Sequence, residues 1–151
     1  MSYQVRPVSD AEVSLVCSSY VQSIWERGNR GPVTYTESCR LGHERIESLL
    51  ASDPIALCVV DPDAPGWCGG WAIGHTLSDG TLALHWVWVK KDFKRLGLAT
   101  MLVRAMLRLP GHTGKIVATR MHRRFAELIA RKNIRMVPLS LALQQRKQVA
   151  A

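Results

Sequence analysis

The chain has 151 residues, of which 47% are hydrophobic and 21% are charged. This composition predicts one globular domain over residues 1–151 and leaves no room for a second full domain. No apolar run approaches the roughly 18 residues that a membrane-spanning helix needs. Residues 1–10 lack the basic and apolar regions of a secretory signal, so we expect a cytoplasmic protein.

The charge is divided unevenly along the sequence. Residues 1–89 carry a net charge of −5, whereas residues 90–151 carry 15 basic and 2 acidic residues, a net charge of +13. A basic half predicts an anionic partner, which could be a phosphorylated cofactor, a nucleic acid, or both. A solvated basic helix surface is the alternative interpretation.

Four cysteines stand far apart, with no Cys-x-x-Cys pair and no His-x-x-x-His to complete a zinc site: Cys17, Cys39, Cys58 and Cys68. This spacing favours reduced thiols that serve as small core or surface residues. We therefore predict no metal.

The first third of the sequence predicts a short extended start followed by two helices. Ser9 or Asp10 supplies an N-cap, and apolar residues then recur at three- and four-residue intervals until Gly28; this spacing predicts a helix. Residues 29–36 are typical of a loop, and residues 37–51 of a second helix.

From residue 54 the pattern is typical of strands. Residues 55–60, 67–76 and 81–89 are apolar and separated by turn residues, which predicts an antiparallel meander. Alternation in the third strand predicts two faces: Leu82, Leu84, Trp86 and Trp88 on one, and Ala83, His85, Val87 and Val89 on the other.

The remaining sequence predicts helix, strand, helix and strand. The first helix begins near Leu98 and stops at Pro110-Gly111, with a buried stripe of Met101, Leu102, Ala105 and Leu109. A strand over residues 115–121, a helix over 122–132 and a strand over 134–143 follow. Residues 144–151 are expected to form a flexible polar tail.

The connection between the third strand and this helix contains a candidate anion site. A strand that leads through a glycine-containing loop into a helix binds phosphates well, because the first helical turn has unpaired N–H groups and a positive dipole end. Gly97 permits close approach of an anion, and Lys94 and Arg95 add positive charge. A simple tight connection is the alternative interpretation.

The string VKKDFKRLGLATML, from Val89 to Leu102, resembles the acyl-CoA motif of the GNAT (N-acetyltransferase) superfamily, an Arg/Gln-x-x-Gly-x-Gly/Ala loop between a strand and a helix. Lys94 takes the Arg/Gln place, Gly97 the central glycine and Ala99 the final small residue. The order of elements is similar as well. The resemblance implies an α/β (α+β) fold with a mixed, mostly antiparallel sheet of about six strands and about four helices, in the order β-α-α-β-β-β-α-β-α-β.

The resemblance also implies a co-substrate, acetyl-CoA or coenzyme A, and transfer of an acyl group to an amine of a small molecule, peptide or protein. Backbone N–H groups of residues 94–99 would hold the pyrophosphate, and the main chain of residues 86–89 would pair with the pantetheine arm. The predicted cofactor-binding residues are Val87, Trp88, Val89, Lys94, Arg95, Leu96, Gly97, Leu98, Ala99 and Thr100.

For catalysis, members of this family often use a carboxylate on the strand before the motif as general base. Here that strand offers His85, whose unperturbed pKa near 6.5 suits proton removal at neutral pH. The tyrosine expected as general acid falls at or near Ile129, which cannot donate a proton. Other candidates are Ser140, His122 and Tyr35, and water could protonate the thiolate.

Two other functions compete with acyl transfer. The basic half, together with tryptophans beside arginines, is also compatible with a protein that modifies or binds nucleic acid. The sequence is similar to GNAT-like proteins of tailed bacteriophages, which would place it in the host cytoplasm. The missing tyrosine is compatible with a non-catalytic structural protein that forms a homodimer.

Overall fold

The computed structural model describes residues 3–26, 34–64, 66–93, 97–120 and 134–146. The chain forms two compact units: a helical unit, Val8–Pro54, and a sheet unit, Met1–Pro7 with Ile55–Ala151. Among the described residues, no helix has the length and apolar character needed to span a membrane. A single domain over the whole chain stays a prediction.

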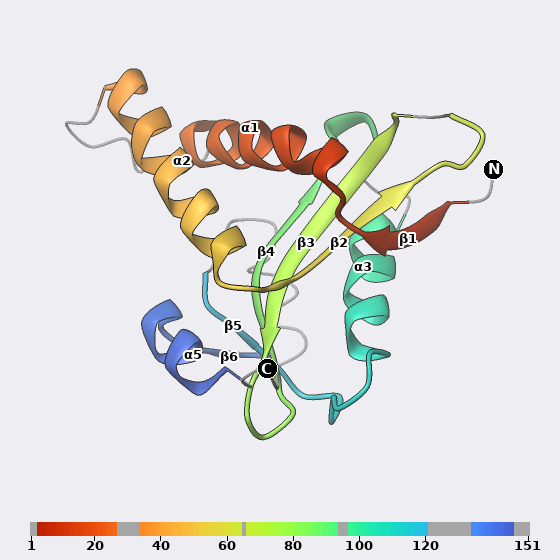
Figure 1. Ribbon diagram of the computed structural model, residues 1–151, viewed down its shortest axis with the longest axis vertical. Helices are drawn as coiled ribbons and strands as arrows, with labels where there is room; N and C mark the ends of the chain where they lie inside the picture. The colour runs from red at the N-terminus through yellow and green to blue at the C-terminus, as the bar shows by residue number, and fades with distance from the viewer. Residues whose placement is uncertain (1–2, 27–33, 65, 94–96, 121–133, 147–151) are drawn as a thin grey trace. The chain divides into compact units, whose positions relative to one another are not determined.

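The helical unit is a pair of helices, α1 (Asp10–Glu26) and α2 (Tyr35–Ala51), drawn in red and orange in Figure 1. Thr34 caps α2 by accepting a hydrogen bond from the Glu37 amide, so the helix starts two residues before the predicted position. A Cβ on Gly42 would lie only 3.1 Å from Cγ2 of Val21. The two helices therefore pack closely at this glycine.

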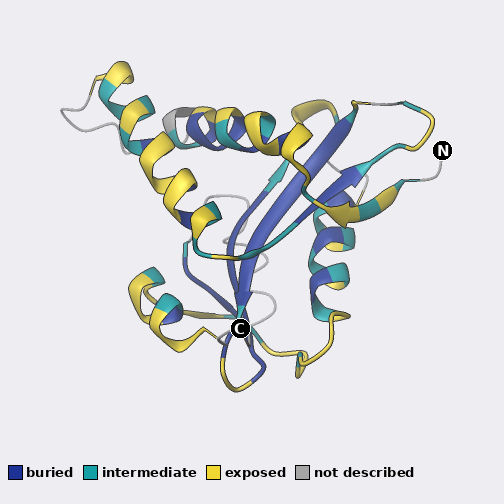
Figure 2. Ribbon diagram, viewed as in Figure 1, coloured by how far each residue is buried: buried dark blue, intermediate teal, exposed yellow. Residues whose placement is uncertain are grey.

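The sheet unit contains six strands in the order β1-β2-β3-β4-β5-β6. Their bounds are β1 Gln4–Pro7, β2 Ile55–Val60, β3 Cys68–Thr76, β4 Leu82–Val89, β5 Ile116–Ala118 and β6 Arg135–Met136. Pairing is antiparallel from β1 to β4 and parallel from β4 to β6. The predicted mixed sheet and antiparallel meander are confirmed, and Figure 2 shows that β3 and β4 are its most buried strands.

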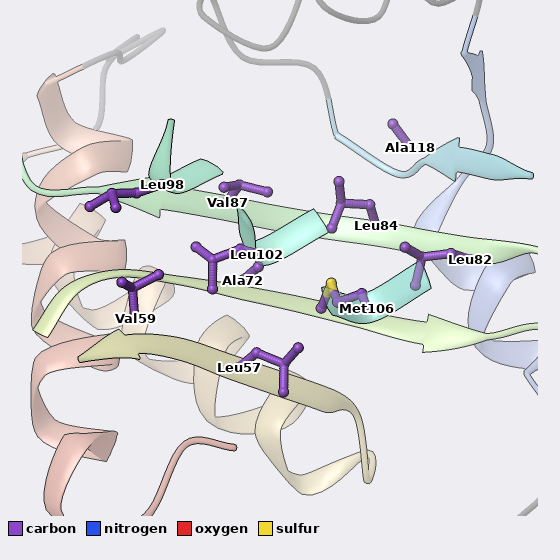
Figure 3. Close-up of a cluster of buried hydrophobic side chains, with 10 residues drawn as sticks. All are labelled: Leu57, Val59, Ala72, Leu82, Leu84, Val87, Leu98, Leu102, Met106 and Ala118. Carbon is purple, nitrogen blue, oxygen red and sulfur yellow. The ribbon is translucent and has the colours of Figure 1, made fainter. Parts of the chain in front are cut away.

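The helix α3 (Leu98–Leu107) lies against this sheet and completes its core. Leu98, Leu102 and Met106 are fully or almost fully buried and face leucine and valine side chains of β2 and β4 (Figure 3). Three residues of the predicted stripe are confirmed: Leu102 is fully buried, and Met101 and Ala105 pack against the same core cluster. Leu109 lies beyond the helix end and is 36% exposed.

A β-bulge interrupts β4 and overturns the predicted faces. Ile73 pairs with Trp86, whereas Gly74 pairs with Leu84, so His85 is the extra residue. Leu82 and Leu84 therefore share the core face with Val87 and not with Trp86 and Trp88. Strict alternation fails because one inserted residue reverses the sides of all that follow.

The C-terminal part differs from the predicted strand over residues 134–143. Only Arg135–Met136 pairs with β5, and Pro138 then precedes a helix, α5 (Leu139–Gln145). Proline has no N–H for a strand ladder but is tolerated at a helix start. Ala142 is fully buried and belongs to a second core cluster with residues of β4 and β5.

The predicted flexible tail over residues 144–151 is also corrected in part. The carbonyl of Gln145 accepts a hydrogen bond from the Ser78 amide at 2.8 Å, and Arg146 forms a bridge with Leu77. The start of the tail is thus tied to the loop after β3. The predicted helix over residues 122–132 lies outside the described residues.

Candidate active site

The start of α3 has the geometry of an anion site. Gly97 is its N-cap residue, with φ 76° and ψ 15°, a left-handed conformation that favours glycine. Its carbonyl accepts the first intrahelical hydrogen bond, from Met101 at 3.0 Å. The amides of Leu98, Ala99 and Thr100 belong to the first turn, whose N–H groups have no partner within a helix.

The surface at Gly97 is open. The residue is exposed, and apart from its chain neighbours and the backbone of its own helix, no atom of the described residues lies within 4 Å of the position that a Cβ would occupy there. A phosphate group could approach this backbone without displacing any described side chain. Lys94, Arg95 and Leu96, three of the predicted cofactor-binding residues, lie outside the described residues.

The end of β4 has one side that faces away from β3. The Lys90 amide donates to the Gly69 carbonyl at 2.8 Å, so the backbone of Lys90 points toward β3. In an antiparallel ladder this direction alternates with every residue. The N–H and C=O groups of Val89 and Val87 therefore point to the opposite side, where β5 lies next in the sheet.

On that side the described pairing of β4 with β5 is short. Their registered pairing runs only from Leu82 to Leu84, and one further bond joins the Thr119 amide to the Leu84 carbonyl at 3.1 Å. No described strand pairs with Val87 or Val89 there. An extended ligand with amide groups could add to this edge as a strand would.

His85 lies at the bulge, where this pairing ends. It is 4% exposed, and both its ring nitrogens are hydrogen-bonded: Nε2 to Nδ1 of His75 and Nδ1 to Oγ1 of Thr119, each at 2.7 Å. Thr119 Oγ1 also lies 3.5 Å from the Leu84 carbonyl. Three side chains from β3, β4 and the end of β5 thus form one buried chain.

The environment makes His85 a weak base. Burial, and secondly the charge of His75, lower the pKa of His85 to about 3, so its imidazole is neutral at pH 7. The expectation of an unperturbed pKa near 6.5 was therefore wrong. A neutral imidazole with both nitrogens bonded takes a proton on one nitrogen readily only while it releases one from the other.

The tryptophan side chains of β3 and β4 mainly pack against other side chains. Trp71 is completely buried and stacks on Trp88, with ring centroids 6.5 Å apart. Trp86 is 6% exposed, and the guanidinium of Arg120 lies 5.9 Å from its ring centroid. Indoles buried in this way are not accessible for stacking on nucleic-acid bases.

The candidates for a general acid are not brought to His85 by any described contact. Ser140 is exposed on α5. Tyr35 is 56% exposed at the start of α2 in the helical unit, and a hydrogen bond to Cys39 raises its pKa. His122 and Ile129 lie outside the described residues. The described residues contain no group of His, Cys, Asp and Glu that could hold a metal.

Sequence reasoning missed His75 and Thr119. The hairpin pairs His75 with Ala83, and regular pairing would leave His85 two residues further along the strand. With the bulge, the His85 ring lies 2.7 Å from the His75 ring between Nε2 and Nδ1. Thr119 directly follows a three-residue strand, and its position beside β4 depends on a parallel pairing that the local sequence does not specify.

Comparison with known proteins identifies a family. The model of the acetyltransferase (GNAT) family matches residues 25–126, more than half of the chain. A search of curated proteins found no match.

Solved structures share the fold. A putative acetyl transferase from Pyrococcus furiosus is 16% identical, with a TM-score of 0.71, over 91% of this chain and 96% of that one. The PaiA N-acetyltransferase of Thermoplasma acidophilum, solved in complex with coenzyme A, is 12% identical, with a TM-score of 0.64, over 87% and 89%. A GNAT acetyltransferase from Staphylococcus aureus Mu50 is 12% identical, with a TM-score of 0.62, over 99% and 95%.

Proposed function

Because the chain belongs to the acetyltransferase (GNAT) family, we propose that it is an acyl-CoA-dependent N-acyltransferase. Its simplest reaction moves acetyl from acetyl-CoA to an amine of a small molecule, a peptide or a protein. The observation that carries the proposal is the end of β4, where an open strand edge leads toward the exposed left-handed Gly97 at the start of α3.

The residues present fit coenzyme A. The open surface at Gly97 and the first-turn amides of α3 suit its phosphates. The outward N–H and C=O groups of Val87 and Val89 suit the amides of its pantetheine arm. Both contacts use the backbone, so side-chain identity matters little except at Gly97. Lys94, Arg95 and Leu96 are included in the proposed site.

The reaction needs little from side chains. The thioester supplies an activated acyl group, and the protein holds an amine beside it and removes a proton. We assign the proton to the chain of His85, His75 and Thr119: a neutral His85 accepts it on one nitrogen while it releases another from the second, and the leaving coenzyme A thiolate finally takes up one proton to become the free thiol. Such a transfer never requires an imidazolium with a pKa near 7.

Calorimetry with acetyl-CoA, followed by a thiol-release assay against a panel of amines, peptides and nucleic acids, tests the proposal. We expect saturable binding and acceptor-dependent thiol release by the unaltered chain. Gly97→Val should greatly weaken binding, because the β-branched side chain is strained at φ 76° and covers the open surface. No heat of binding at millimolar acetyl-CoA would contradict the proposal.

A second variant tests the assigned proton acceptor. His85→Gln should lower the turnover number and leave the dissociation constant of acetyl-CoA unchanged, because the side chain belongs to the proton path and not to the backbone contacts. An unchanged turnover number would remove His85 from the mechanism while leaving acyl transfer in place.

Binding of nucleic acid is the second candidate function. Arg104 and Arg108 are exposed on α3 and have no ion-pair partner among the described residues, so they add to the positive surface. A salt-dependent shift of DNA on a gel would favour this function, because phosphate contacts release counterions. The cytoplasmic location, the bacteriophage source and the homodimer remain predictions.

A further inference from the structure

An aromatic cluster lies next to the start of α3, at the edge of the proposed acyl-CoA site. Trp67 directly precedes β3, and its indole stacks on the Tyr3 ring at 5.3 Å between centroids. The ring of Phe93 meets the same indole edge-on at 4.9 Å. The three residues are half-buried and pack against the main core cluster. We call them the Trp67 cluster.

The indole is held on a rigid part of the sheet unit. The Trp67 amide donates to the Ala64 carbonyl at 3.0 Å and closes the turn before β3. Two residues later, the Gly69 carbonyl accepts the Lys90 amide and extends the β3–β4 ladder by one pair. The backbone on both sides of the ring is therefore hydrogen-bonded, and the contacts with Tyr3 and Phe93 hold the ring orientation.

The same indole reaches the first residue of α3. A Cβ on Gly69 would lie 2.5 Å from Cη2 of Trp67 and 3.0 Å from Cδ1 of Leu98, so these two side chains meet above the glycine. Leu98 is 1% exposed. Only glycine at position 69 leaves room for the ring between the strand and the helix.

Phe93 ends the turn that leaves β4. Residues Lys91–Phe93 form a short 3₁₀ helix, η1, in which the Phe93 amide donates to the Lys90 carbonyl at 2.9 Å. The Lys90 ammonium lies 5.8 Å from the Phe93 ring centroid. Trp67 thus contacts Phe93, where the chain leaves β4, and lies close to Leu98, where it enters α3.

We propose that Trp67 is a positioning residue for acyl-CoA: by holding Phe93 and Leu98 it fixes the backbone at Gly97, which precedes Leu98. This inference rests on the proposed function. A small displacement of backbone donors weakens a phosphate contact strongly, because hydrogen bonds depend steeply on distance and angle. The chemical step lies at the bulge around His85, so the cluster should affect cofactor binding and not turnover.

The test compares Trp67→Leu with Met106→Ala. Met106 is completely buried at the other end of α3, so its replacement removes core packing without touching the Trp67 cluster. We expect Trp67→Leu to raise the dissociation constant of acetyl-CoA roughly tenfold, the scale of one lost aromatic contact with some displacement. The turnover number at saturating acetyl-CoA should stay within about twofold.

Gly69→Ala should also disturb the position of the Trp67 ring, and it does so without removing any side chain. The new methyl group would lie 2.5 Å from the indole, so the ring must move off Leu98, and the dissociation constant should rise as for Trp67→Leu. This variant keeps the test valid if Trp67→Leu does not fold. Restoring a ring with Trp67→Phe should recover part of the affinity.

Several outcomes would overturn the inference while leaving the proposed function intact. One is unchanged acetyl-CoA affinity in both Trp67→Leu and Gly69→Ala. Another is an equal loss in Met106→Ala, because general loosening of α3 would then explain the effect. Absence of binding by the unaltered chain would instead overturn the proposed function itself.

Discussion

The strand β4 has two halves that differ in what lies beside them. From Leu82 to Leu84 it pairs with β3 on one side and β5 on the other, and its side chains are buried. From Val87 to Val89, described pairing is with β3 alone. The bulge at His85 separates the halves. The bulge therefore coincides with the point where the described pairing of β4 with β5 ends, and we propose that the side of β4 beyond it binds a ligand.

The largest expected effect is on stability, in the half of β4 from Leu82 to Leu84 that pairs with both β3 and β5. Leu84→Ala should lower the free energy of unfolding by about 3 kcal/mol, because it leaves a cavity in the core. Urea denaturation measures this loss. Leu109→Ala is the matched control and should cost no more than about 0.5 kcal/mol, since this leucine is exposed. Equal losses would contradict the burial of Leu84 and the exposure of Leu109.

The boundary residue His85 should make stability depend on pH. Its pKa is about 3 in the folded chain and about 6.5 when unfolded, so below pH 6.5 the unfolded state binds a proton that the folded state does not. The free energy of unfolding should therefore decrease as the pH is lowered. This residue contributes a decrease of about 2 kcal/mol between pH 7 and pH 5.

Urea denaturation at several pH values checks this dependence. His85→Gln should flatten the curve, whereas Met106→Ala should lower stability by a similar amount at each pH and keep the slope. If the unaltered chain and His85→Gln gave parallel curves, the lowered pKa of His85 would be wrong.

In the half of β4 from Val87 to Val89, we expect a smaller effect, on acetyl-CoA affinity, that depends on the backbone alone. Val89→Pro removes an N–H that points away from β3 and is tolerated as on an edge strand, and it should raise the dissociation constant of acetyl-CoA about fivefold. Val89→Ala keeps the N–H and should change it less than about twofold. Calorimetry measures both constants. A larger loss in Val89→Ala would indicate side-chain recognition.

The smallest effect is expected outside both halves. Replacement of Arg104 and Arg108 by glutamine should change the free energy of unfolding by no more than about 0.5 kcal/mol, because both are exposed. Acetyl-CoA affinity should stay the same in calorimetry. A loss of DNA binding with unchanged acetyl-CoA affinity would support the second candidate function.

Most elements of the fold follow from the sequence, because their signals are local. The helices over residues 10–26 and 35–51 follow from apolar periodicity, except that the N-cap at Thr34 was not predicted. The strands over residues 55–60, 68–76 and 82–89 follow from apolar runs between turn residues. The glycine at the start of α3 was identifiable because a left-handed N-cap requires that residue type.

The way in which these elements meet depends on contacts between distant segments of the chain. The bulge at His85 depends on pairing with β3, and the full burial of Leu98 and Met106 depends on the contact of α3 with the sheet. Pro138 turned an apolar segment into α5, whose Ala142 packs beside β5. The pKa of His85 is lowered by burial and by a histidine ten residues away. Pairing partners, burial and desolvation arise from segments distant in sequence, so local patterns do not contain them.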